Sequence, residues 1–369
     1  MRRLLFHIHV VVGVATGLYV FVIGISGAAL VFRIDMQRAL HPHLFTARAT
    51  GPLAEPVAVM ASVSRAYPRH RLSGVEAPTT SRPTYLAYVT SGVEFRTVLV
   101  DPVSTDVLGE LPDHTPIQAL QELHFNLLGG RAGRLVNGAG AFAILILCAT
   151  GLVIWWPGAR AWRRGFMVDT SRDGPPSPRL WRPSRRVLWE LHRAIGIWTV
   201  AFTVMFAVTG LSFVFPSGLR AVVDSVSTIT VARSPQSGAP AAGNTPPSWA
   251  QMLDRARGFA AGQHVARVVM PFGDRGAFLV MFANESPTPA GSELTSIYLD
   301  QYTGDRLATT SSGRTMGDAA MAAMAPLHVG GVGGQTGKVI WFLFGLGPPI
   351  LFVSGFILWW IRKVRPRLS

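Results

Sequence analysis

The chain has 369 residues, of which 49% are hydrophobic and only 15% are charged, and its mean hydropathy is +0.32. A disordered chain is poor in apolar residues, so this composition excludes disorder, and a wholly soluble protein of this size rarely has so positive a hydropathy. The single cysteine, Cys148, excludes a disulfide framework, a cysteine zinc site and an iron–sulfur cluster held by the chain. The formal net charge of +14 is compatible with nucleic acid, a membrane surface or membrane topology.

Four apolar segments are long enough to cross a bilayer, which needs about 20 residues. In chain order they are residues 10–32, 135–156, 195–215 and 339–361, and none has a charge in its interior. The first is too long for the apolar core of a typical signal peptide, and three matching segments follow it. The predicted division is membrane helix 1–34, outer module 35–130, helix 131–157, cytoplasmic Arg- and Pro-rich loop 158–190, helix 191–216, outer module 217–332, and helix with cytoplasmic tail 333–369.

The positive charge follows this topology. If the N-terminus lies in the cytoplasm, the inside segments 1–9, 157–194 and 362–369 carry 15 Lys and Arg and 3 acidic residues, a net charge of +12. The outside segments 33–134 and 216–338 carry a net charge of only +1 each. Cytoplasmic loops of membrane proteins are enriched in Lys and Arg. The charge therefore indicates membrane topology with both termini in the cytoplasm and two large outer loops, and nucleic acid is not predicted as a partner.

The first and third spans repeat one another. Each begins near a histidine, His9 or His192, with Gly13 or Gly196 four residues later. Eighteen residues after the histidine each has a second glycine, which Ser26 precedes in the first span and Thr209 in the third. This agreement indicates that the two spans have a common origin.

The second and fourth spans repeat one another more fully. Counting from His124 and from His328, identical or similar residues recur at offsets five, six, nine, ten, twenty-seven, thirty-one and thirty-two. These positions are Gly129, Gly130, Gly133, Arg134, Gly151, Trp155 and Trp156 in one copy and Gly333, Gly334, Gly337, Lys338, Gly355, Trp359 and Trp360 in the other. Two matching pairs of spans predict a duplicated two-helix unit whose copies have parallel topology.

The outer segments also resemble each other. Helix-like residues 53–66 and 249–261 precede alternating runs that are typical of strands: 84–89, 95–100, 265–270, 276–282 and 296–299. Each strand group ends in a similar turn, 101–106 or 300–305. The predicted fold is an α-helical membrane protein with a bundle of four membrane helices built from the duplicated unit, and two α+β modules outside the membrane.

Four histidines occupy equivalent positions at the edges of the spans: His9, His124, His192 and His328. A histidine there is costly without a partner, so these residues are functional candidates. Two neutral imidazoles that face each other across a bundle can take both axial positions of a haem iron. We therefore predict two b-type haems, one between His9 and His192 at the cytoplasmic side and one between His124 and His328 at the outer side.

Other residues of the repeat suit the same interpretation. Haem is flat and wide, so small residues are expected beside it: Gly13 and Gly196 near the first histidine pair, and Gly129, Gly130, Gly333 and Gly334 near the second. Arg134 and Lys338 are expected to neutralise the anionic propionates. Arg134 and Lys338 are equally compatible with a role as interfacial anchors. The four histidines are also compatible with a structural role, a proton relay or a metal site.

One geometric question stays open at the sequence level. A helix from His9 to Gly27 rises about 27 Å, whereas a continuous helix from His124 to Gly151 would rise about 40 Å. Either His124 projects beyond the bilayer or the chain folds back at the glycine pair Gly129-Gly130.

The same residues carry a resemblance to a known family. The patterns Leu-His-Arg-x-x-Gly to Thr-Gly in the third span, and Leu-His-Phe, Gly-Arg, Thr-Gly-Leu and Trp-Trp-Pro in the second, resemble the PepSY-associated transmembrane family. The outer modules resemble PepSY domains, and the chain is similar to FoxB-type inner-membrane ferric-siderophore reductases. The resemblance implies that His9, His124, His192 and His328 are haem ligands and that the chain lies in a bacterial inner membrane with two periplasmic loops. Val10 stands where the family usually has Arg after the histidine.

The leading hypothesis is a haem-dependent oxidoreductase that takes electrons from an unidentified cytoplasmic or membrane donor and reduces a ferric siderophore or other ferric chelate in the periplasm. Its predicted partners are the lipid bilayer and the chelate. The alternative is a membrane-anchored PepSY module that binds a peptide or protease without redox chemistry. A transporter ranks last, because the spans contain no carboxylates.

Overall fold

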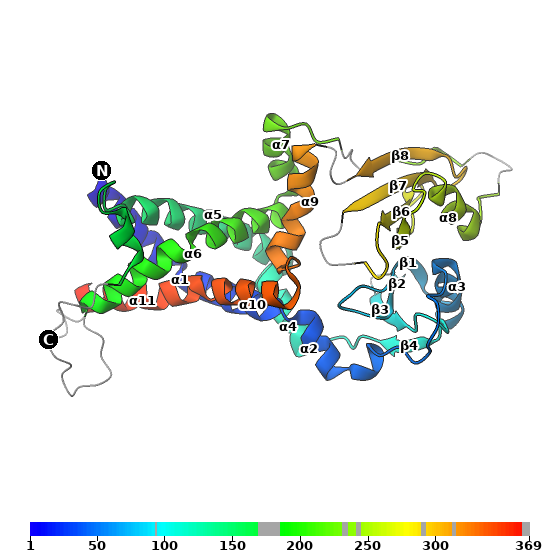
Figure 1. Cartoon of the computed structure of the whole chain (residues 1–369), viewed down its shortest axis with the longest axis horizontal. Helices are drawn as coiled ribbons and strands as arrows, with labels where there is room; N and C mark the ends of the chain where they lie inside the picture. Colours follow the sequence, from blue (N-terminus) through cyan, green and yellow to red (C-terminus); the bar gives the residue numbers. More distant parts are fainter. Residues whose placement is uncertain are drawn as a thin grey trace. The chain divides into compact units, whose positions relative to one another are not determined.

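The computed structural model describes residues 1–92, 94–168, 185–230, 235–240, 245–288, 293–311 and 315–363, and most of the predicted Arg- and Pro-rich loop lies outside them. The chain forms two compact units (Figure 1). The helical unit comprises Met1–Phe32, Pro116–Leu219 and Leu327–Ser369. The sheet unit comprises Arg33–Thr115 and Arg220–Pro326. The chain therefore leaves the helical unit twice and returns to it twice.

Four helical stretches of the helical unit are long and apolar enough to cross a membrane, as the sequence predicts. They are Arg2–Leu30 (α1), Gly130–Trp155 (α5), Arg185–Val214 (α6) and Gly334–Lys363 (α10 and α11). Helices α1 and α6 begin earlier than residues 10 and 195, because Arg, His and Glu are compatible with a helix at the water boundary. The protein is an α-helical membrane protein.

The fourth span is interrupted once. Helix α10 ends at Gly345 and α11 runs from Gly347 to Lys363. Pro348 and Pro349 follow this junction and lack the backbone N–H that would continue the helical hydrogen bonds. A Cβ atom at Gly347 would lie 2.7 Å from the Thr199 side chain, so the junction also allows close contact with α6.

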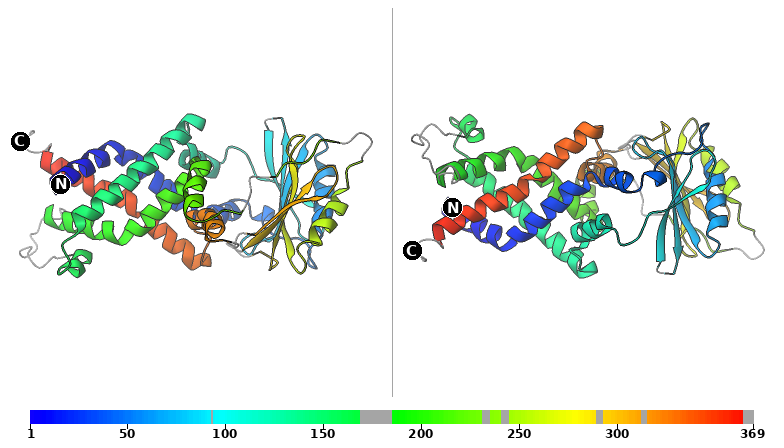
Figure 2. Two further views of the ribbon diagram at one scale, coloured as in Figure 1. Left: turned by 90° about the horizontal axis from the view of Figure 1, so that it is seen from above. Right: turned by 90° about the horizontal axis from the view of Figure 1, so that it is seen from below.

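The membrane helices form a closed bundle (Figure 2). Helix α1 packs against α5 and α11, and α6 packs against the same two helices. Glycines permit the close approach: a Cβ at Gly17 would lie 2.0 Å from the Phe352 ring, and one at Gly140 would lie 2.1 Å from the Tyr19 ring. Small residues at helix contacts are typical of membrane bundles, where packing replaces the hydrophobic effect.

Two further helices precede the second and fourth spans and are joined to them by tight reversals of the chain. Helix α4 (Pro116–Asn126) precedes α5, and α9 (Met316–Val329) precedes α10. Backbone φ angles are positive at Leu127, Leu128 and Gly130 in the first reversal, and at Gly330, Gly333 and Gly334 in the second. These conformations end one helix before the next begins. The chain thus folds back at the glycine pair, which is one of the two arrangements that the sequence leaves open.

The sheet unit contains one antiparallel sheet of eight strands in the order β4-β3-β2-β1-β5-β6-β7-β8. The strands are Arg71–Glu76 (β1), Tyr85–Ser91 (β2), Glu94–Val100 (β3), Val107–Glu110 (β4), His264–Val269 (β5), Ala277–Ala283 (β6), Leu294–Asp300 (β7) and Arg306–Ser311 (β8). Strands β1 and β5 pair with Val75 opposite Val268. The two strand groups that the sequence predicts as separate modules therefore share one sheet.

One face of this sheet carries the core. Helices α3 (Pro56–Ala66) and α8 (Trp249–Arg257) both pack on it, as Figure 2 shows. Val59, Met60 and Val63 of α3 are fully buried, and Met252 and Leu253 of α8 are at most 2% exposed. Side chains from both strand groups contribute to the same hydrophobic cluster. The sheet and its two helices are therefore one folding unit rather than two.

The order of elements in the first half recurs in the second half. Both halves run from a membrane helix through a short helix, α2 (Arg33–Leu40) or α7 (Pro216–Val226), to a sheet helix, four strands, a reversed helix and a second membrane helix. Two short 3₁₀ helices have no counterpart in the described residues, η1 (Pro42–Leu44) and η2 (Trp162–Phe166).

A buried aspartate closes the corresponding turn of each strand group. Asp101 is fully buried, and its carboxylate accepts hydrogen bonds from the backbone N–H groups of Arg48, Ala49, Val103 and Ser104. Asp300 accepts backbone hydrogen bonds from Gly238, Tyr302 and Thr303. Burial alone would raise the pKa of Asp101, but its four donors outweigh burial and lower the pKa to about 2.

We predict that Asp101→Asn lowers the free energy of unfolding of the sheet unit by about 2–3 kcal/mol at pH 7, because backbone donors lose a charged acceptor. Since the folded pKa of about 2 lies below the ordinary value of 3.8, the stabilisation is complete above pH 4 and is lost as the pH falls through 2. Resistance of the full-length protein to pepsin between pH 2 and 4 measures this. Asp274→Asn, at an exposed turn, is the matched control, and equal losses in both variants would contradict the prediction.

Candidate functional site

Four histidines come together as two pairs within the helical unit. His9 of α1 lies beside His192 of α6, with ring centres 6.5 Å apart and ring planes at 87°. His124 of α4 lies beside His328 of α9, with ring centres 6.1 Å apart and ring planes at 45°. The structure therefore brings together the same residues that the internal repeat pairs.

A Ser or Thr hydroxyl holds each imidazole. The oxygen lies 2.8–3.0 Å from the Nδ1 atom in all four cases: Thr150 beside His9, Ser26 beside His124, Ser354 beside His192 and Thr209 beside His328. Every one of these hydroxyls belongs to a Ser-Gly or Thr-Gly dipeptide of the repeat. The sequence shows that the dipeptides recur, but it does not show what they contact.

The hydroxyls also determine which imidazole nitrogen carries the proton. Each hydroxyl lies 2.6–2.8 Å from the backbone carbonyl four residues earlier, to which it donates: Val22, Ile146, Met205 or Ile350. A hydroxyl has one hydrogen, so with that hydrogen donated to the carbonyl its oxygen accepts from the neighbouring imidazole, and this arrangement favours a proton on Nδ1. In the part of the chain that the structure describes, the side-chain hydrogen bonds of these four rings are all at Nδ1, and a ring that carries its proton there keeps its lone pair on Nε2. The lone pair of each Nε2 atom is therefore available to a ligand.

The glycine that follows each hydroxyl makes room for the ring. A Cβ atom would lie 2.7 Å from the Cε1 atom of His124 at Gly27, and 3.1 Å from that of His192 at Gly355. The corresponding distances are 3.3 Å at Gly151 and 3.5 Å at Gly210. The dipeptide thus combines a hydrogen-bonding oxygen with a surface flat enough for an imidazole to lie against the helix.

The two pairs are separate sites. Helix α1 carries His9 of one pair and Ser26, the hydroxyl partner of the other pair, seventeen positions later. Helix α6 carries His192 and Thr209 with the same spacing. Seventeen helical residues rise about 25 Å, which is close to the thickness of the hydrocarbon core. The pairs therefore lie near opposite ends of the spans.

The spacing within each pair suits one metal ion between the rings. A metal-bound imidazole nitrogen lies about 2 Å from the ion, and the ring centre is about 1 Å further away, so two opposed rings have centres about 6 Å apart. The observed separations are 6.5 and 6.1 Å. The described residues contain no group of three or more His, Cys, Asp or Glu side chains that fits a metal ion. An ion held here would take its other ligands from a non-protein group, as the iron of a haem does.

The other predicted site residues differ in where they lie. Cβ atoms at Gly13 and Gly196 would have only one leucine side chain within 4 Å, at 3.6 and 3.7 Å, so space remains one turn from His9 and His192. Gly129, Gly130, Gly333 and Gly334 lie in the two helix reversals, and three of them have positive φ. Their observed role is in the turn, and a contact with a cofactor stays a prediction.

The predicted cations lie in the first turns of α5 and α10. The Arg134 guanidinium donates to the backbone carbonyl of Phe213, whose ring centre is 5.3 Å from that of His328. Arg134 is therefore close to the His124–His328 pair. Lys338 occupies the equivalent position of α10.

The family comparison covers nearly all of these elements. The family model for the PepSY-associated TM region matches residues 6–362. The chain belongs to the PepSY-associated transmembrane family. All four histidines and their hydroxyl partners lie inside the matched region of this family member. No curated protein matches the chain.

Sequence reasoning missed a polar contact between α1, α5 and the end of α4. Tyr19 donates to the side-chain oxygen of Asn137 over 2.8 Å, and the Asn137 amide donates to the backbone carbonyls of His124 and Phe125. These carbonyls end helix α4 and have no helical partner. The contact therefore fixes the end of the helix that carries His124. A single Tyr and a single Asn inside apolar spans were the available signal.

We predict that the four paired histidines are the Nδ1–H tautomer, and that Thr150→Val changes His9 alone. Valine keeps the shape of threonine but offers no acceptor, so the His9 proton loses its partner. The ¹⁵N chemical shifts of histidine-labelled full-length protein measure the tautomer at each site. Thr203→Val, which removes a buried hydroxyl bonded only to the Thr199 carbonyl, is the control. A proton on Nε2 of these histidines in the wild-type protein would overturn the assignment.

Proposed function

We propose that this member of the PepSY-associated transmembrane family is a transmembrane electron-transfer protein with two b-type haems. One haem is held between His9 and His192 and the other between His124 and His328. The observation that carries the proposal is the geometry of the two pairs: a Ser or Thr hydroxyl lies 2.8–3.0 Å from each Nδ1 atom, and the ring centres of the pairs are 6.5 and 6.1 Å apart.

The chain supplies the ligands and fixes their orientation. The Nε2 atoms of the four histidines would hold the haem irons, and the hydroxyl at each Nδ1 atom restricts rotation of the ring. Gly13 and Gly196 leave space beside the first pair, and Arg134 and Lys338 supply positive charge near the second. The iron of a bound haem accepts and gives up one electron at a time.

Helices α1 and α6 hold both sites at a fixed distance. Each of these helices provides a histidine to one pair and a hydroxyl to the other, so α1 and α6 together set the positions of both histidine pairs. A site near each end of the spans is what a protein needs if it carries electrons through hydrocarbon that excludes ions.

The proposed setting is a bacterial inner membrane, with both termini in the cytoplasm and the sheet unit, formed by the two PepSY-like segments, in the periplasm. The net charge of +12 on the segments at the ends of the chain and in the Arg-rich loop supports this orientation. The recurrence of the element order supports duplication of a two-helix unit.

The proposed substrate is a ferric siderophore or another ferric chelate in the periplasm. The activity is therefore that of a ferric-chelate reductase, with electrons from a cytoplasmic or membrane donor. One electron converts Fe(III) to Fe(II), which binds hard oxygen ligands less tightly, so the reduced metal leaves the chelate for uptake. The competing function, a PepSY module that binds a peptide or protease, needs neither the four histidines nor their tautomer.

We predict that the full-length protein, made with haem supplied, gives a b-type α band after dithionite reduction and contains two haems. His192→Ala removes the haem of the first pair only and His328→Ala that of the second pair only, because each change deletes one axial ligand. Haem per protein and the reduced spectrum measure this, and His264→Ala, an exposed histidine of β5, is the control. A colourless wild-type protein would favour the peptide-binding function, and two intact six-coordinate haems in either variant would refute the pairing.

A second prediction uses the glycines behind the rings. Gly27→Ala places a Cβ 2.7 Å from His124, so the ring must move, and we expect the second haem to be lost or weakly held. Gly210→Ala places a Cβ 3.5 Å from His328, an ordinary contact, and should retain both haems. Haem content and the ligand-field bands of the two variants compare them directly. Equal loss in both would show that the contact between the Cβ atom and the imidazole does not set the requirement for glycine.

A further inference from the structure

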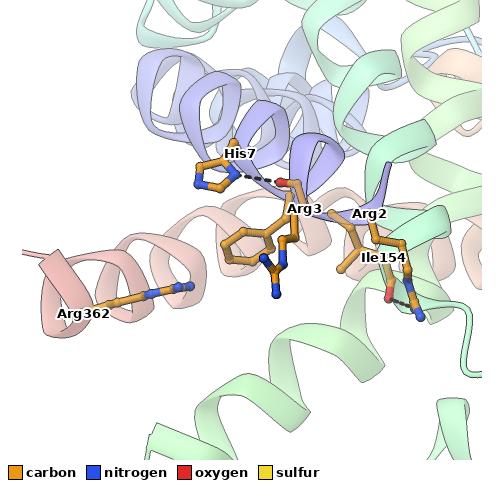
Figure 3. A pocket seen from close by; sticks show the side chains of 6 residues that line it. Arg2, Arg3, His7, Ile154 and Arg362 are labelled. Atoms are coloured by element: carbon orange, nitrogen blue, oxygen red, sulfur yellow. Dashed lines mark hydrogen bonds between the residues drawn. The ribbon is translucent and has the colours of Figure 1, made fainter.

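One cavity lies at the end of the bundle where α1 begins and α11 ends. It has a volume of about 370 Å³ and is lined by Arg2, Arg3, Phe6, His7, Ile154 and Arg362. Figure 3 shows the side chains of Arg3 and Arg362 on its two sides and Arg2 bonded to α5. The Arg2 guanidinium lies 3.0 and 2.8 Å from the carbonyls of Ile154 and Trp156, to which it donates. Three membrane helices therefore meet at a cationic pocket.

The pocket lacks negative charge of its own. None of its lining residues is acidic, and in the described residues none of its three arginines forms an ion pair. The Arg362 guanidinium lies 5.3 Å from the centre of the Phe6 ring, and the Arg3 side chain has no hydrogen bond within the described chain. Guanidinium groups are suited to phosphate, to which they donate in a planar fork.

At the start of α6, the counterpart of the start of α1, an ion pair takes the place of the pocket. Measured from the paired histidines, Arg2 and Arg3 of α1 correspond to Arg185 and Arg186 of α6, and His7 corresponds to Glu190. Glu190 lies 2.5 Å from Arg193, whose guanidinium also donates to the carbonyls of Gly165 and Met167.

The segment around η2 therefore covers this end of α6. Trp155 and Trp198 donate to the carbonyls of Gly165 and Phe166, and the Phe166 ring packs between them. In the first half, His7 and Val10 stand at the positions of Glu190 and Arg193, so this ionic pair has no counterpart there. In the same half, Arg2 donates to the Ile154 and Trp156 carbonyls, whereas the Arg3 and Arg362 side chains have no hydrogen bond or ion pair within the described residues.

We propose that this pocket binds the phosphodiester headgroup of an anionic phospholipid, with the phosphate between Arg3 and Arg362. The pocket lies at the water boundary of α1 and α11, and basic pockets between membrane helices bind such headgroups. The surface of α1 beside it is apolar and exposed: Leu4 is 64% exposed and Val11 is 66% exposed. That surface accommodates acyl chains, which a free phosphate ion does not have.

The test compares two double variants of the full-length protein by native mass spectrometry in micelles containing equal amounts of phosphatidylglycerol and phosphatidylcholine. Arg3→Gln with Arg362→Gln removes two charges from the pocket. Arg163→Gln with Arg185→Gln removes the same charge from elsewhere in the chain. The wild-type protein should retain one phosphatidylglycerol in preference to phosphatidylcholine. The pocket variant should lose affinity about thirty-fold, and the control variant less than about threefold.

A second arm adds inorganic phosphate at millimolar concentration, which should not displace phosphatidylglycerol. Displacement would mean that the pocket is a soluble phosphate site, and equal losses in the two double variants would mean that the lipid responds to net charge alone. Either result, or a wild-type protein without preference for the anionic lipid, overturns the proposal. Far-ultraviolet circular dichroism confirms that both variants are folded, so a loss of lipid is not a loss of structure.

Discussion

The hydrogen bond between a Ser or Thr hydroxyl and a histidine Nδ1 atom is the interaction on which the helical unit depends. It occurs four times and joins α1 to α4 and α5, and α6 to α9 and α11. In hydrocarbon a polar side chain has no water to replace a lost partner, so each bond is costly to break. The direction is fixed because the hydroxyl hydrogen already belongs to its own helix. One contact therefore constrains both the register of the helices and the orientation of the imidazole rings.

This contact also explains the two helix reversals. Without the reversals, His124 and His328 would lie on extensions of α5 and α10 that continue past the ends of α1 and α6. Positive φ angles at Leu127 and Leu128 cost conformational energy, since non-glycine residues avoid this region. The reversals allow α4 to pack beside α1, where His124 contacts Ser26, and they allow His328 of α9 to contact Thr209. The glycine-rich turns thus serve histidine placement even where the glycines touch no ring.

The sequence predicts the four spans, the paired histidines and the repeat, because apolar length and fixed spacing are local properties. It does not predict β1, β4 or β8. Strand β1 contains Gly74, where a Cβ would lie 2.7 Å from the Val268 carbonyl, and its partner β5 lies almost 200 residues further along the chain. A local pattern carries no information about such a partner, so the union of two strand groups into one sheet emerges only in three dimensions. The hydroxyl–histidine contacts could not be predicted for the same reason, because their partners lie far apart in the sequence. The Ser-Gly and Thr-Gly dipeptides that make them are nevertheless repeated in the sequence.

The two halves show which parts of the site are constrained. Thirteen residues after the reversed-helix histidine, the first half has Asn137 and the second has Trp341. Asn137 donates to the His124 carbonyl over 2.7 Å, and Trp341 donates to the Leu327 carbonyl over 2.5 Å. The helix carrying the histidine ends in carbonyls without partners, and any donor of suitable reach satisfies them. At the histidines the groups themselves recur: each of the four imidazoles contacts a Ser or Thr hydroxyl. The contact that ends the histidine helix thus tolerates an amide or an indole, whereas the histidine contact keeps an imidazole and a hydroxyl in all four cases.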